Sequence, residues 1–399
     1  MLKSLDDIDL AGKRVLIRTD FNVPLADGRV ADDTRIREAA ATIREVLAAG
    51  GRPVVMSHLG RPKGQPRPDL SLKIVVPDLS RILGDVPVTF ARDCVGDAAR
   101  EAVEAGRDGV VLLENLRFHP GEEGNDPNFA VELALSGDCY VNDAFSSAHR
   151  AHASVVGVPE RLPAVAGRLL QHEVESLEAA FAQPARPALA LVGGAKVDDK
   201  LKAIAHFSQR FDAVAVAGGV ANTFLRADGR EVGGSLVAPD LLATAQEIRD
   251  HARDQGCELI LPEDVVVADE VAPGAAGRTV PVAEVGPGDR IVDLGPRSVA
   301  RIVEELAKAT VVAWAGPLGA ADKGFPEATE AVAREIVRLG RESGLRSVAG
   351  GGETMAALRA AGLADGFGYL SLGGGAFLKW LGGERLPGLQ PLLRSPPAA

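Results

Sequence analysis

The segment that decides the fold is ALALVGGAKVDDKLK, Ala188–Lys202. Its first five residues are apolar and predict a buried strand. The strand is followed by two glycines and Lys196. The acidic first turn of a predicted helix, which carries Lys200, comes next. Unpaired backbone N–H groups and the helix dipole meet at such a helix start, so the segment is suited to bind phosphate. The alternative is an ordinary strand-to-helix turn with a solvated lysine. The segment is not a G-x-x-x-x-G-K-[ST] phosphate loop.

The same alternation of apolar strands and helical stretches runs through the whole chain. Predicted strands of the first half are Arg14–Arg18, Pro53–Met56, Val110–Leu113, Cys139–Asn142 and a run from Val165. Those of the second half are Ala188–Val192, Ala213–Ala217, Glu258–Leu261, Thr310–Ala315, Arg346–Val348 and Gly368–Leu370. Helices are predicted between them, for example Thr34–Ala49 and Phe129–Leu135. This pattern predicts an α/β protein with two doubly wound domains built on parallel sheets.

The boundary between the two series is predicted at a connecting helix. The sequence LLQHEVESLEAAF, Leu169–Phe181, has apolar residues at helical spacing, and Pro184 and Pro187 end the helix. We therefore expect a first domain at 1–168, a connecting helix and hinge at 169–183, a second domain at 184–380 and a tail at 381–399. The proline-rich end from Arg385 is expected to be an irregular surface strap.

The composition excludes several classes of protein. The chain has 399 residues, 46% of them hydrophobic, which is enough for two or three core-forming domains. A net charge of −11 argues against general nucleic-acid or membrane-surface binding. The separated cysteines Cys94, Cys139 and Cys257 are typical of buried thiols in a reducing compartment. With no leader-like N-terminus or long apolar run, we expect a cytoplasmic protein.

Charged and polar residues follow the strands of the first half. Ligands of parallel α/β sheets bind beyond the carboxyl ends of the strands. The residues found there are Asp20, Asn22, His58, Arg61, Arg117 and Arg150, and Arg35 lies near the start of a helix that Asp32 or Asp33 could cap. Several guanidinium groups at one sheet edge suit a small ligand that carries phosphate and carboxylate groups.

Each of these residues also has a structural interpretation. Asp20 and Asn22 could form an Asx turn before Pro24, and a loop arginine usually pairs with a neighbouring carboxylate. His149 and His152 form an HxxH pair, which is weak evidence for a metal without further ligands. The set as a whole favours a binding site more strongly than any member does.

The motifs together resemble the phosphoglycerate kinase family from about Leu5 to Gly388. The order and spacing match over RTDFNVP, SHLGRPKG, LENLRFHPGEE, VNDAFSSAHRAHAS, LVGGAKVDDK, AGGVANTF, DLGP, WAGPLG, GGGET and LSLGGGA…LPG. The resemblance implies two Rossmann-like domains facing across a cleft and joined by a helix hinge. It also implies that the tail packs back on the N-terminal domain and that the protein is a monomer.

The resemblance also implies the site residues. The N-terminal domain would bind 3-phosphoglycerate or 1,3-bisphosphoglycerate through Asp20, Asn22, Arg35, His58, Arg61, Arg117 and Arg150. The C-terminal domain would bind ATP or ADP through Lys196, Lys200, Gly218, Gly219, Asp322, Gly351, Gly352, Glu353 and Thr354. Mg²⁺ would be held mainly by the nucleotide phosphates, with Glu353 as its protein ligand.

The implied reaction is reversible phosphoryl transfer between 1,3-bisphosphoglycerate with ADP and 3-phosphoglycerate with ATP, in glycolysis and gluconeogenesis. Its nucleophile is a carboxylate that is already ionised, so no general base is needed. Charge on the transferring group would be stabilised by Arg35, by Lys196 and by the helix N-termini at Gly351 and Gly374 when the domains close.

The sequence departs from the family pattern mainly in its second half. Asp322 stands in place of a ribose-binding glutamate, after Ala321 in place of an aromatic residue, and Glu353 in place of an aspartate that assists Mg²⁺. Ile291, Ala315, Leu372 and Lys379 replace a glycine, an asparagine, a hydroxyl residue and an acidic residue. Shifts of about 1 Å in a carboxylate can cost roughly 10²-fold in rate.

These departures leave a second hypothesis open: a triose-phosphate-binding relative with impaired or altered nucleotide use. A third, an NAD-linked dehydrogenase, is disfavoured because no G-x-G-x-x-G with a matching acidic residue follows a strand.

Overall fold

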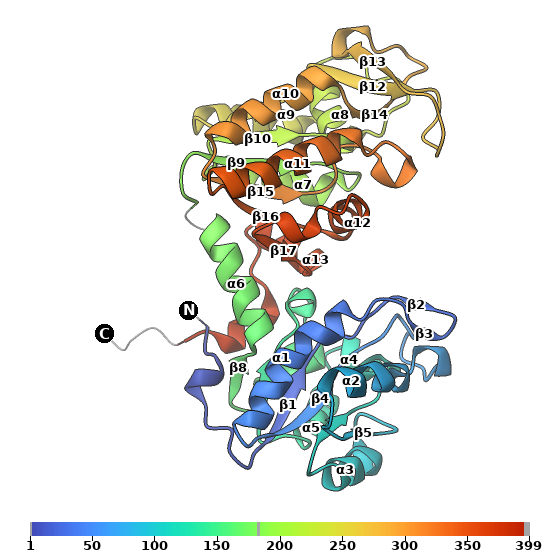
Figure 1. The fold of residues 1–399 in the computed structure, drawn as a ribbon, viewed down its shortest axis with the longest axis vertical. Helices are drawn as coiled ribbons and strands as arrows, with labels where there is room; N and C mark the ends of the chain where they lie inside the picture. Colours follow the sequence, from blue (N-terminus) through green and yellow to red (C-terminus); the bar gives the residue numbers. More distant parts are fainter. Residues whose placement is uncertain (1, 182–183, 395–399) are drawn as a thin grey trace. The chain divides into compact units, whose positions relative to one another are not determined.

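The computed structural model describes residues 2–181 and 184–394, which form two compact units (Figure 1). The first unit comprises residues 2–174 and 385–394, and the second comprises the described residues from 175 to 384. The division falls inside helix α6 (Arg168–Phe181). The predicted connecting helix at 169–183 corresponds to α6, although residues 182 and 183 lie outside the described ranges.

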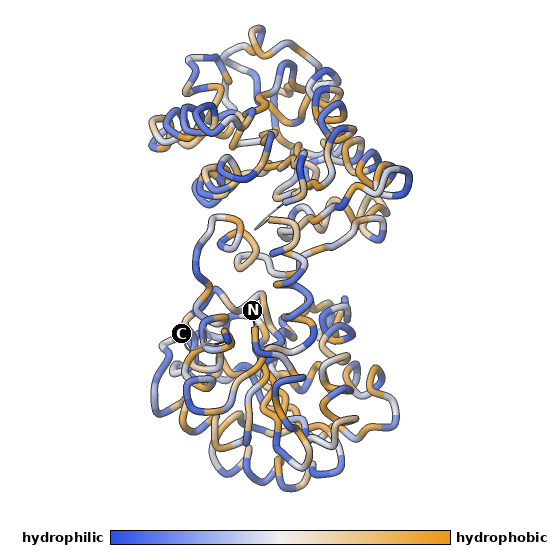
Figure 2. The backbone as a smooth tube through the Cα atoms, turned by 90° about the vertical axis from the view of Figure 1, so that its left-hand side faces the viewer, coloured by the Kyte–Doolittle hydropathy of each residue, from blue (hydrophilic) through white to orange (hydrophobic). Residues whose placement is uncertain are grey.

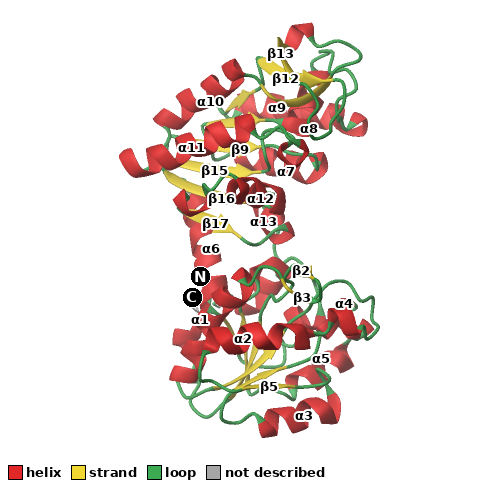
Figure 3. Ribbon diagram, turned by 45° about the vertical axis from the view of Figure 1, so that its right-hand side comes forward, coloured by secondary structure: helices red, strands yellow, loops and turns green. Residues whose placement is uncertain are grey.

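The first unit is built on a parallel sheet with the strand order β5-β6-β4-β1-β7-β8. Its strands are β1 (Arg14–Arg18), β4 (Arg52–Met56), β5 (Val88–Phe90), β6 (Val110–Leu112), β7 (Cys139–Asn142) and β8 (Ala164–Ala166), with a small hairpin of β2 (Leu25–Ala26) and β3 (Arg29–Val30). Its helices are α1 (Thr34–Ala48), α2 (Val76–Leu83), α3 (Gly96–Ala105), α4 (Pro120–Glu123) and α5 (Pro127–Ala134). Figure 3 shows the strands enclosed by these helices.

Helices α1 and α2 cover one face of the first sheet. Ile36 and Ile43 of α1 pack in one buried cluster with Val15 and Ile17 of β1. Because neighbouring strand residues point to opposite faces, Leu16, also buried, belongs to the other face. Burial on both faces explains why the strand is continuously apolar until Arg18.

The second unit contains a parallel sheet with the order β11-β10-β9-β15-β16-β17. Its strands are β9 (Ala188–Val192), β10 (Ala213–Val216), β11 (Glu258–Ile260), β15 (Val311–Ala315), β16 (Arg346–Gly350) and β17 (Tyr369–Ser371). Its helices are α7 (Val197–Phe207), α8 (Gly218–Ala227), α9 (Leu242–Asp254), α10 (Pro296–Lys308), α11 (Glu327–Glu342), α12 (Gly352–Ala360) and α13 (Gly375–Leu381). The prediction of an α/β protein with two parallel sheets is confirmed.

A second, antiparallel sheet in this unit was not predicted. It has the order β13-β12-β14 and consists of β12 (Asp264–Ala268), β13 (Arg278–Pro281) and β14 (Arg290–Leu294). Val265 and Val267 of β12 pack with Val280 and Val285 in a small core of its own. The short edge strand β5 of the first unit was missed as well, because all three of its residues are only half buried.

The end of the described chain packs on the first unit. Leu386 and Leu389 are buried, and the Gly388 N–H donates to the carbonyl of Ala148 at 2.9 Å. Residues Pro387–Leu392 form 3-10 turns, so this part is more regular than the predicted irregular strap. From Arg385 onward the described residues belong to the first unit.

Hydropathy follows this arrangement in both units. Figure 2 shows hydrophobic stretches in the interior of each unit and hydrophilic stretches at many outer turns. The three cysteines are free and buried, as predicted. Among the described helices, none combines the length and the apolar character that a membrane span requires.

Candidate functional site

The strand order of the first sheet reverses between β1 and β7, and the predicted ligand residues lie around this point. Strands β4, β6 and β5 extend from one side of β1, whereas β7 and β8 extend from the other. Connections at the carboxyl ends of two such strands diverge and leave a crevice, where open α/β sheets bind ligands. Asp20 and Asn22 follow β1, and Arg150 follows β7.

Asp20 connects three segments of the first unit. Its Oδ2 accepts hydrogen bonds from Arg35 Nη1 of α1 and from Ser146 Oγ, and its Oδ1 accepts from the Asn22 N–H at 3.0 Å. The Asp20 carboxylate therefore forms the predicted Asx-type turn with Asn22, and the same carboxylate also contacts Arg35 of the candidate site. Arg35 is anchored by this carboxylate at the sheet edge, which explains a basic side chain near a helix start.

Capping of α1 follows one of the two predicted alternatives. Asp33 occupies the N-cap position but makes no capping bond with its side chain. The neighbouring Asp32 instead accepts from the Thr34 N–H at 2.9 Å. The Asp33 carboxylate forms ion pairs with Arg37 and Arg81 on the exposed side of the helix.

Asn22 and Arg117 meet the same short loop after β4. Asn22 Oδ1 accepts from the Gly60 N–H at 2.8 Å, and Arg117 Nη1 donates to the Gly60 carbonyl at 2.8 Å. Arg117 is buried, and its Nε lies 3.3 Å from Glu123 Oε1. Its buried Nη2 has no hydrogen-bond partner among the residues that the structure describes. Burying a guanidinium N–H that has no acceptor costs free energy, unless a bound ligand supplies the acceptor.

His58 is held as a neutral ring by a buried arginine. Arg18 Nη2 lies 3.2 Å from His58 Nδ1. Because a guanidinium only donates, Nδ1 must accept, and the ring proton is therefore on Nε2. Burial, followed by the charges of Arg18 and Arg150, lowers the pKa of His58 well below its usual value. His58 is thus available as an uncharged N–H donor at neutral pH.

Positive charge is concentrated around His58. Arg35 and His152 also contribute to its lowered pKa, which places them in the same neighbourhood. Burial, followed by the charges of Arg61 and Arg18, lowers the pKa of Arg150. Arginines that weaken each other's protonation in this way create a field that favours a small anion with several charges.

Arg18 was not among the predicted site residues. It is fully buried, and its Nε donates to Ser154 Oγ at 2.9 Å. Ser154 Oγ in turn donates to Glu122 Oε1 at 2.6 Å. Although burial opposes its ionisation, His152, Arg18 and Ser154 together lower the pKa of the buried Glu122 carboxyl. The available signal was an arginine that directly follows the buried apolar residues 15–17 of β1.

The second sheet has its own reversal point, between β9 and β15. Strands β10 and β11 lie on one side of β9, and β15, β16 and β17 on the other. The glycines after β9 are packed closely against two other loops. A Cβ on Gly218 (φ +60°), the first residue of α8, would lie 3.0 Å from the Gly194 N. The neighbouring Gly219 carbonyl accepts from Thr223 Oγ1 at 2.7 Å.

Lys196 and Lys200 have different environments on the same helix start. Lys196 is the exposed N-cap residue of α7. Lys200 is buried, and its Nζ donates to the Gly193 carbonyl. Burial lowers the pKa of Lys200 to about 8, although the nearby Glu353 acts in the opposite direction.

The start of α12 is next to this lysine. Gly351 is the N-cap with φ +98°, Gly352 is the first helical residue, and the exposed Glu353 follows. A Cβ on Gly194 would lie 3.3 Å from Glu353 Oε2, so the β9 loop and this carboxylate are neighbours. Thr354 is buried, and its Oγ1 accepts from the Gly316 N–H at 2.8 Å.

Comparison with known proteins agrees with this arrangement. The family model "Phosphoglycerate kinase" matches residues 5–384. The chain is 50% identical over 392 residues to a phosphoglycerate kinase of Cereibacter sphaeroides, covering 98% of this chain and 99% of the relative. The structure is similar to phosphoglycerate kinases from Coxiella burnetii (TM-score 0.88, 36% identity, 98% and 99% coverage) and Pyrococcus horikoshii (TM-score 0.80, 30% identity, 98% and 98% coverage). The chain belongs to the phosphoglycerate kinase family. It is therefore a phosphotransferase.

The residues that depart from the pattern of the phosphoglycerate kinase family have defined places. Ala315 ends β15 and is buried, and its carbonyl accepts from the Gly193 N–H at 3.0 Å. Ile291 lies in β14 and packs against the core of the antiparallel sheet. Leu372 is half buried before α13, whose N-cap is Gly374 with φ +51°. Lys379 lies 3.5 Å from Glu384.

Asp322, the candidate ribose ligand of the phosphoglycerate kinase pattern, is exposed. It belongs to the 3-10 turn Ala321–Lys323, and its Oδ2 lies 3.0 Å from Lys323 Nζ. This turn contacts α12. The structure thus places Asp322 near the helix that carries Glu353 and Thr354, and its carboxylate pairs with the exposed neighbour Lys323.

The HxxH pair does not form a metal site in the part of the chain that the structure describes. His149 Nε2 accepts from Arg150 Nε at 3.2 Å, and His152 Nδ1 lies 3.7 Å from Glu122 Oε1. Within residues 2–181 and 184–394, the group with metal-binding geometry consists of other residues, Asp93, Cys94 and His119.

Proposed function

We propose that the chain interconverts 1,3-bisphosphoglycerate plus ADP with 3-phosphoglycerate plus ATP, as an enzyme of glycolysis and gluconeogenesis. The first unit binds the triose phosphate, and the second unit binds the nucleotide. The observation that carries this proposal is the buried Arg117 Nη2, which lacks an acceptor among the described residues. Further arginines, Arg18, Arg35 and Arg150, gather around His58 in the same unit.

The first unit offers donors that match a phosphorylated carboxylic acid. Arg35, Arg61, Arg117 and Arg150 supply guanidinium groups, which bind carboxylates and phosphates in a forked geometry. The neutral His58 donates without adding charge. Asp20 and Asn22 fix Arg35 and the Gly60 loop, and their remaining lone pairs suit the hydroxyl group of the substrate.

The second unit offers donors that match nucleotide phosphates. The N–H groups at the starts of α7, α8 and α12 are backbone donors of the type that binds phosphate. Lys196 and Lys200 add positive charge at the first of these starts, Gly218 and Gly219 form the second, and Gly351, Gly352 and Thr354 form the third. We assign Asp322 to the ribose side of the nucleotide.

Glu353 fits a magnesium–nucleotide complex. Its exposed carboxylate lies near Lys200, and Mg²⁺ in such sites is held by one or two carboxylates together with phosphates. The ion would neutralise charge on the phosphates. Glu353 would orient that complex, while Lys200 balances the charge of the carboxylate itself.

Transfer then depends on alignment and charge stabilisation. The attacking carboxylate of 3-phosphoglycerate is ionised at neutral pH and needs no base. Arg35 and Lys196 stabilise charge on the transferring group, assisted by the backbone N–H groups at Gly351 and Gly374. Asp20 keeps the Arg35 guanidinium oriented, so little reorganisation is needed when the charge develops.

A coupled steady-state assay tests the proposal. Purified protein with MgATP and 3-phosphoglycerate should turn over, and omission of either substrate should abolish the signal. GTP in place of ATP measures the base preference. A folded protein without turnover in either direction would refute the proposed enzyme activity.

A second candidate is a triose-phosphate-binding relative with impaired or altered nucleotide use. It is favoured by the exposed, lysine-paired Asp322 and by the side chains of Ile291 and Leu372. Calorimetry separates the two candidates, because this second one predicts binding of 3-phosphoglycerate without measurable binding of MgADP. Our proposal also retains a monomeric, cytoplasmic protein, which sedimentation and cell fractionation would test.

A further inference from the structure

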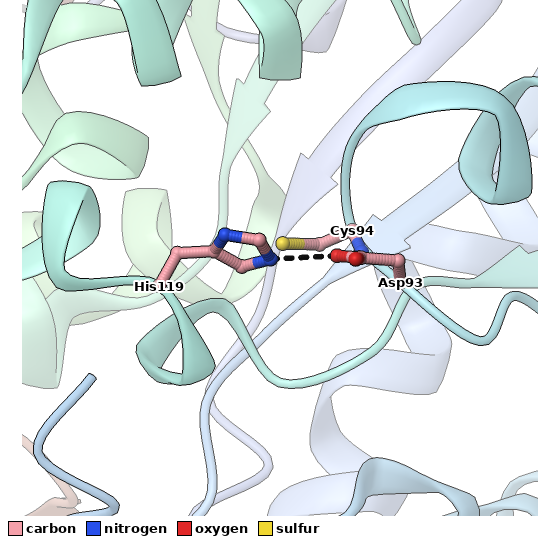
Figure 4. Close-up of side chains that lie close together, drawn as sticks. All are labelled: Asp93, Cys94 and His119. Carbon is pink, nitrogen blue, oxygen red and sulfur yellow. Dashed lines mark hydrogen bonds and ion pairs between the residues drawn. The ribbon is translucent and has the colours of Figure 1, made fainter. Parts of the chain in front are cut away.

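We propose that Asp93, Cys94 and His119 of the first unit form a binding site for a divalent transition metal of the zinc type. One oxygen, one sulfur and one nitrogen atom from these side chains all lie within 4.8 Å of one another. Figure 4 shows the Cys94 sulfur beside the His119 ring, with the Asp93 carboxylate at the ring nitrogen. None of these residues has a role in the proposed phosphoryl transfer.

The local structure brings the three side chains together from two segments. Asp93 and Cys94 lie between β5 and α3, and His119 is the N-cap residue of α4. The His119 ring stacks on Phe129 with centroids 5.1 Å apart, which restricts its orientation. Its Nε2 lies 2.7 Å from Asp93 Oδ1, which also accepts from the Cys94 N–H at 2.7 Å.

The spacing requires only a small adjustment for a metal. With bonds of about 2.0–2.3 Å and tetrahedral angles, ligand atoms would lie about 3.3–3.6 Å apart. The histidine–aspartate pair is now closer than this, as expected when a proton occupies the place of the ion. Asp93 is partly exposed and can move outward by the difference.

The chemistry of the donors selects the class of metal. Thiolate and imidazole ligands favour Zn²⁺ and related ions over Mg²⁺ or Ca²⁺, which prefer oxygen. Three protein ligands leave a fourth position for water. On binding, the Cys94 S–H bond breaks, its proton leaves for solvent, and sulfur donates its electron pair to the ion. The imidazole loses its Nε2 proton to solvent while Nδ1 takes up a proton from solvent, so the ring stays neutral and the Nε2 lone pair is free to bind the ion.

Two surrounding features support a cation at this place. The side chains of Asp93 and His119 line a cavity of about 510 Å³, together with Glu114, which gives an ion a path to the site. Glu114, which lines this cavity, adds negative charge that favours a cation, and a coordinated thiol is deprotonated.

Cobalt titration tests the site. The full-length, reduced and metal-free protein, without nucleotide, is titrated with Co²⁺. We expect a thiolate-to-cobalt charge-transfer band that saturates near one equivalent and is displaced by Zn²⁺. Cys94→Ser should abolish the band, and His119→Gln should weaken cobalt binding at least about tenfold.

The other two cysteines provide matched controls, because both are also buried. Cys139→Ser and Cys257→Ser should keep the band. Circular dichroism shows whether each variant is folded, and His119→Gln tests the site if Cys94→Ser does not fold. The proposal is overturned if the folded parent protein gives no band, if the band survives Cys94→Ser, or if His119→Gln binds cobalt as tightly as the parent.

Discussion

Arg35 and Arg37 are two residues apart on α1, but their side chains have different partners. Arg35 donates to Asp20 at the edge of the sheet, whereas Arg37 pairs with Asp33 through two bonds of 2.7 and 2.9 Å on the exposed side. We expect Arg35→Ala to lower kcat/KM by about 10²- to 10³-fold, the usual cost of one charge-stabilising donor. The coupled assay measures this effect.

Arg37→Ala is the matched control for that prediction. An exposed i,i+4 ion pair contributes little to stability, so this variant should keep its activity and most of its stability. Chemical denaturation should show both variants folded. Equal losses of activity in the two variants would show that the effect comes from α1 as a whole and not from the guanidinium at the sheet edge.

Because the pKa of Lys200 is lowered, we expect nucleotide binding to depend on pH. Burial lowers its pKa to about 8 from an ordinary value of 10.5. Above about pH 8 the free protein loses this positive charge, so MgADP affinity should fall by up to about tenfold per pH unit. Calorimetry over this range measures the slope. In Lys200→Met the slope should disappear and the affinity should be low throughout; an unchanged slope would assign the titration to another group.

The lowered pKa of Lys200 also changes the free energy of unfolding with pH, and this change has the opposite sign to the change in MgADP affinity. Below about pH 8 Lys200 is protonated in both the folded and the unfolded chain, so its contribution is constant. Between about 8 and 10.5 the unfolded chain binds more protons than the folded chain. The contribution of Lys200 to the free energy of unfolding therefore rises with pH in this window, while the affinity for MgADP falls.

At the scale of elements, helix α8 begins at Gly218 and ends at Ala227, and a second glycine, Gly229, follows its C-cap residue Asp228. Gly218 has φ +60° and is packed against Gly194, whereas Gly229 has φ +75° and open space around its Cβ position. We expect Gly218→Ala to lower MgADP affinity at least about tenfold, and to destabilise the second unit by more than the roughly 1–2 kcal/mol of backbone strain alone. Isothermal calorimetry and urea unfolding measure the two effects.

Gly229→Ala introduces the same kind of backbone strain at positive φ, but its Cβ makes no close contact. It should cost only about 1–2 kcal/mol and leave the affinity for MgADP unchanged. If the two variants behave alike, the strain at φ > 0 explains the result, and the contact between the starts of α7 and α8 has no role in nucleotide binding.

The elements that could be predicted from the sequence are those with continuous local patterns. Strand β1 and helix α1 are marked by apolar runs and helical spacing, and both lie within one or two residues of the prediction. The antiparallel sheet was missed because its pairing is not local; Val266 of β12 pairs with Thr279 and Asp293. A short apolar run shows neither its partner nor its direction.

The same distinction applies to the candidate site. Residues directly after apolar strands, such as Asn22 and His58, could be named because the carboxyl ends of parallel strands share one edge. Arg18 could not, because Ser154, the partner that defines its role, is 136 positions away. The metal-binding group was missed for the same reason, since Asp93 and His119 are 26 positions apart and lie in different loops.

At the scale of the whole molecule, each unit has its own core and its own reversal of strand order. The first reversal is bordered by arginines, and the second by glycine turns with lysines. Guanidinium groups suit a compact ligand with a carboxylate, whereas glycine turns at helix starts suit a chain of phosphates. The proposed division of the two substrates between the units therefore rests on the chemistry of each edge, independently of the other unit.

Hydrogen exchange with each ligand tests this division. With 3-phosphoglycerate alone, we expect protection at Thr19–Asn22, Ser57–Arg61 and Ser147–Arg150. With MgADP alone, we expect protection at Gly193–Lys200 and Gly350–Thr354. Bound ligands protect the amides that they contact or order, because they shift the local opening equilibrium.

Arg35→Ala separates local binding from general stabilisation in this experiment. It should remove the protection by 3-phosphoglycerate in the first unit and leave the protection by MgADP at Gly193–Lys200 unchanged, because Arg35 pairs with Asp20 of the first unit. Helix α3, which contains none of the proposed ligand residues, serves as the internal reference. Protection of Gly193–Lys200 by 3-phosphoglycerate alone, with no change at Ser57–Arg61, would reverse the assignment of substrates to the two units.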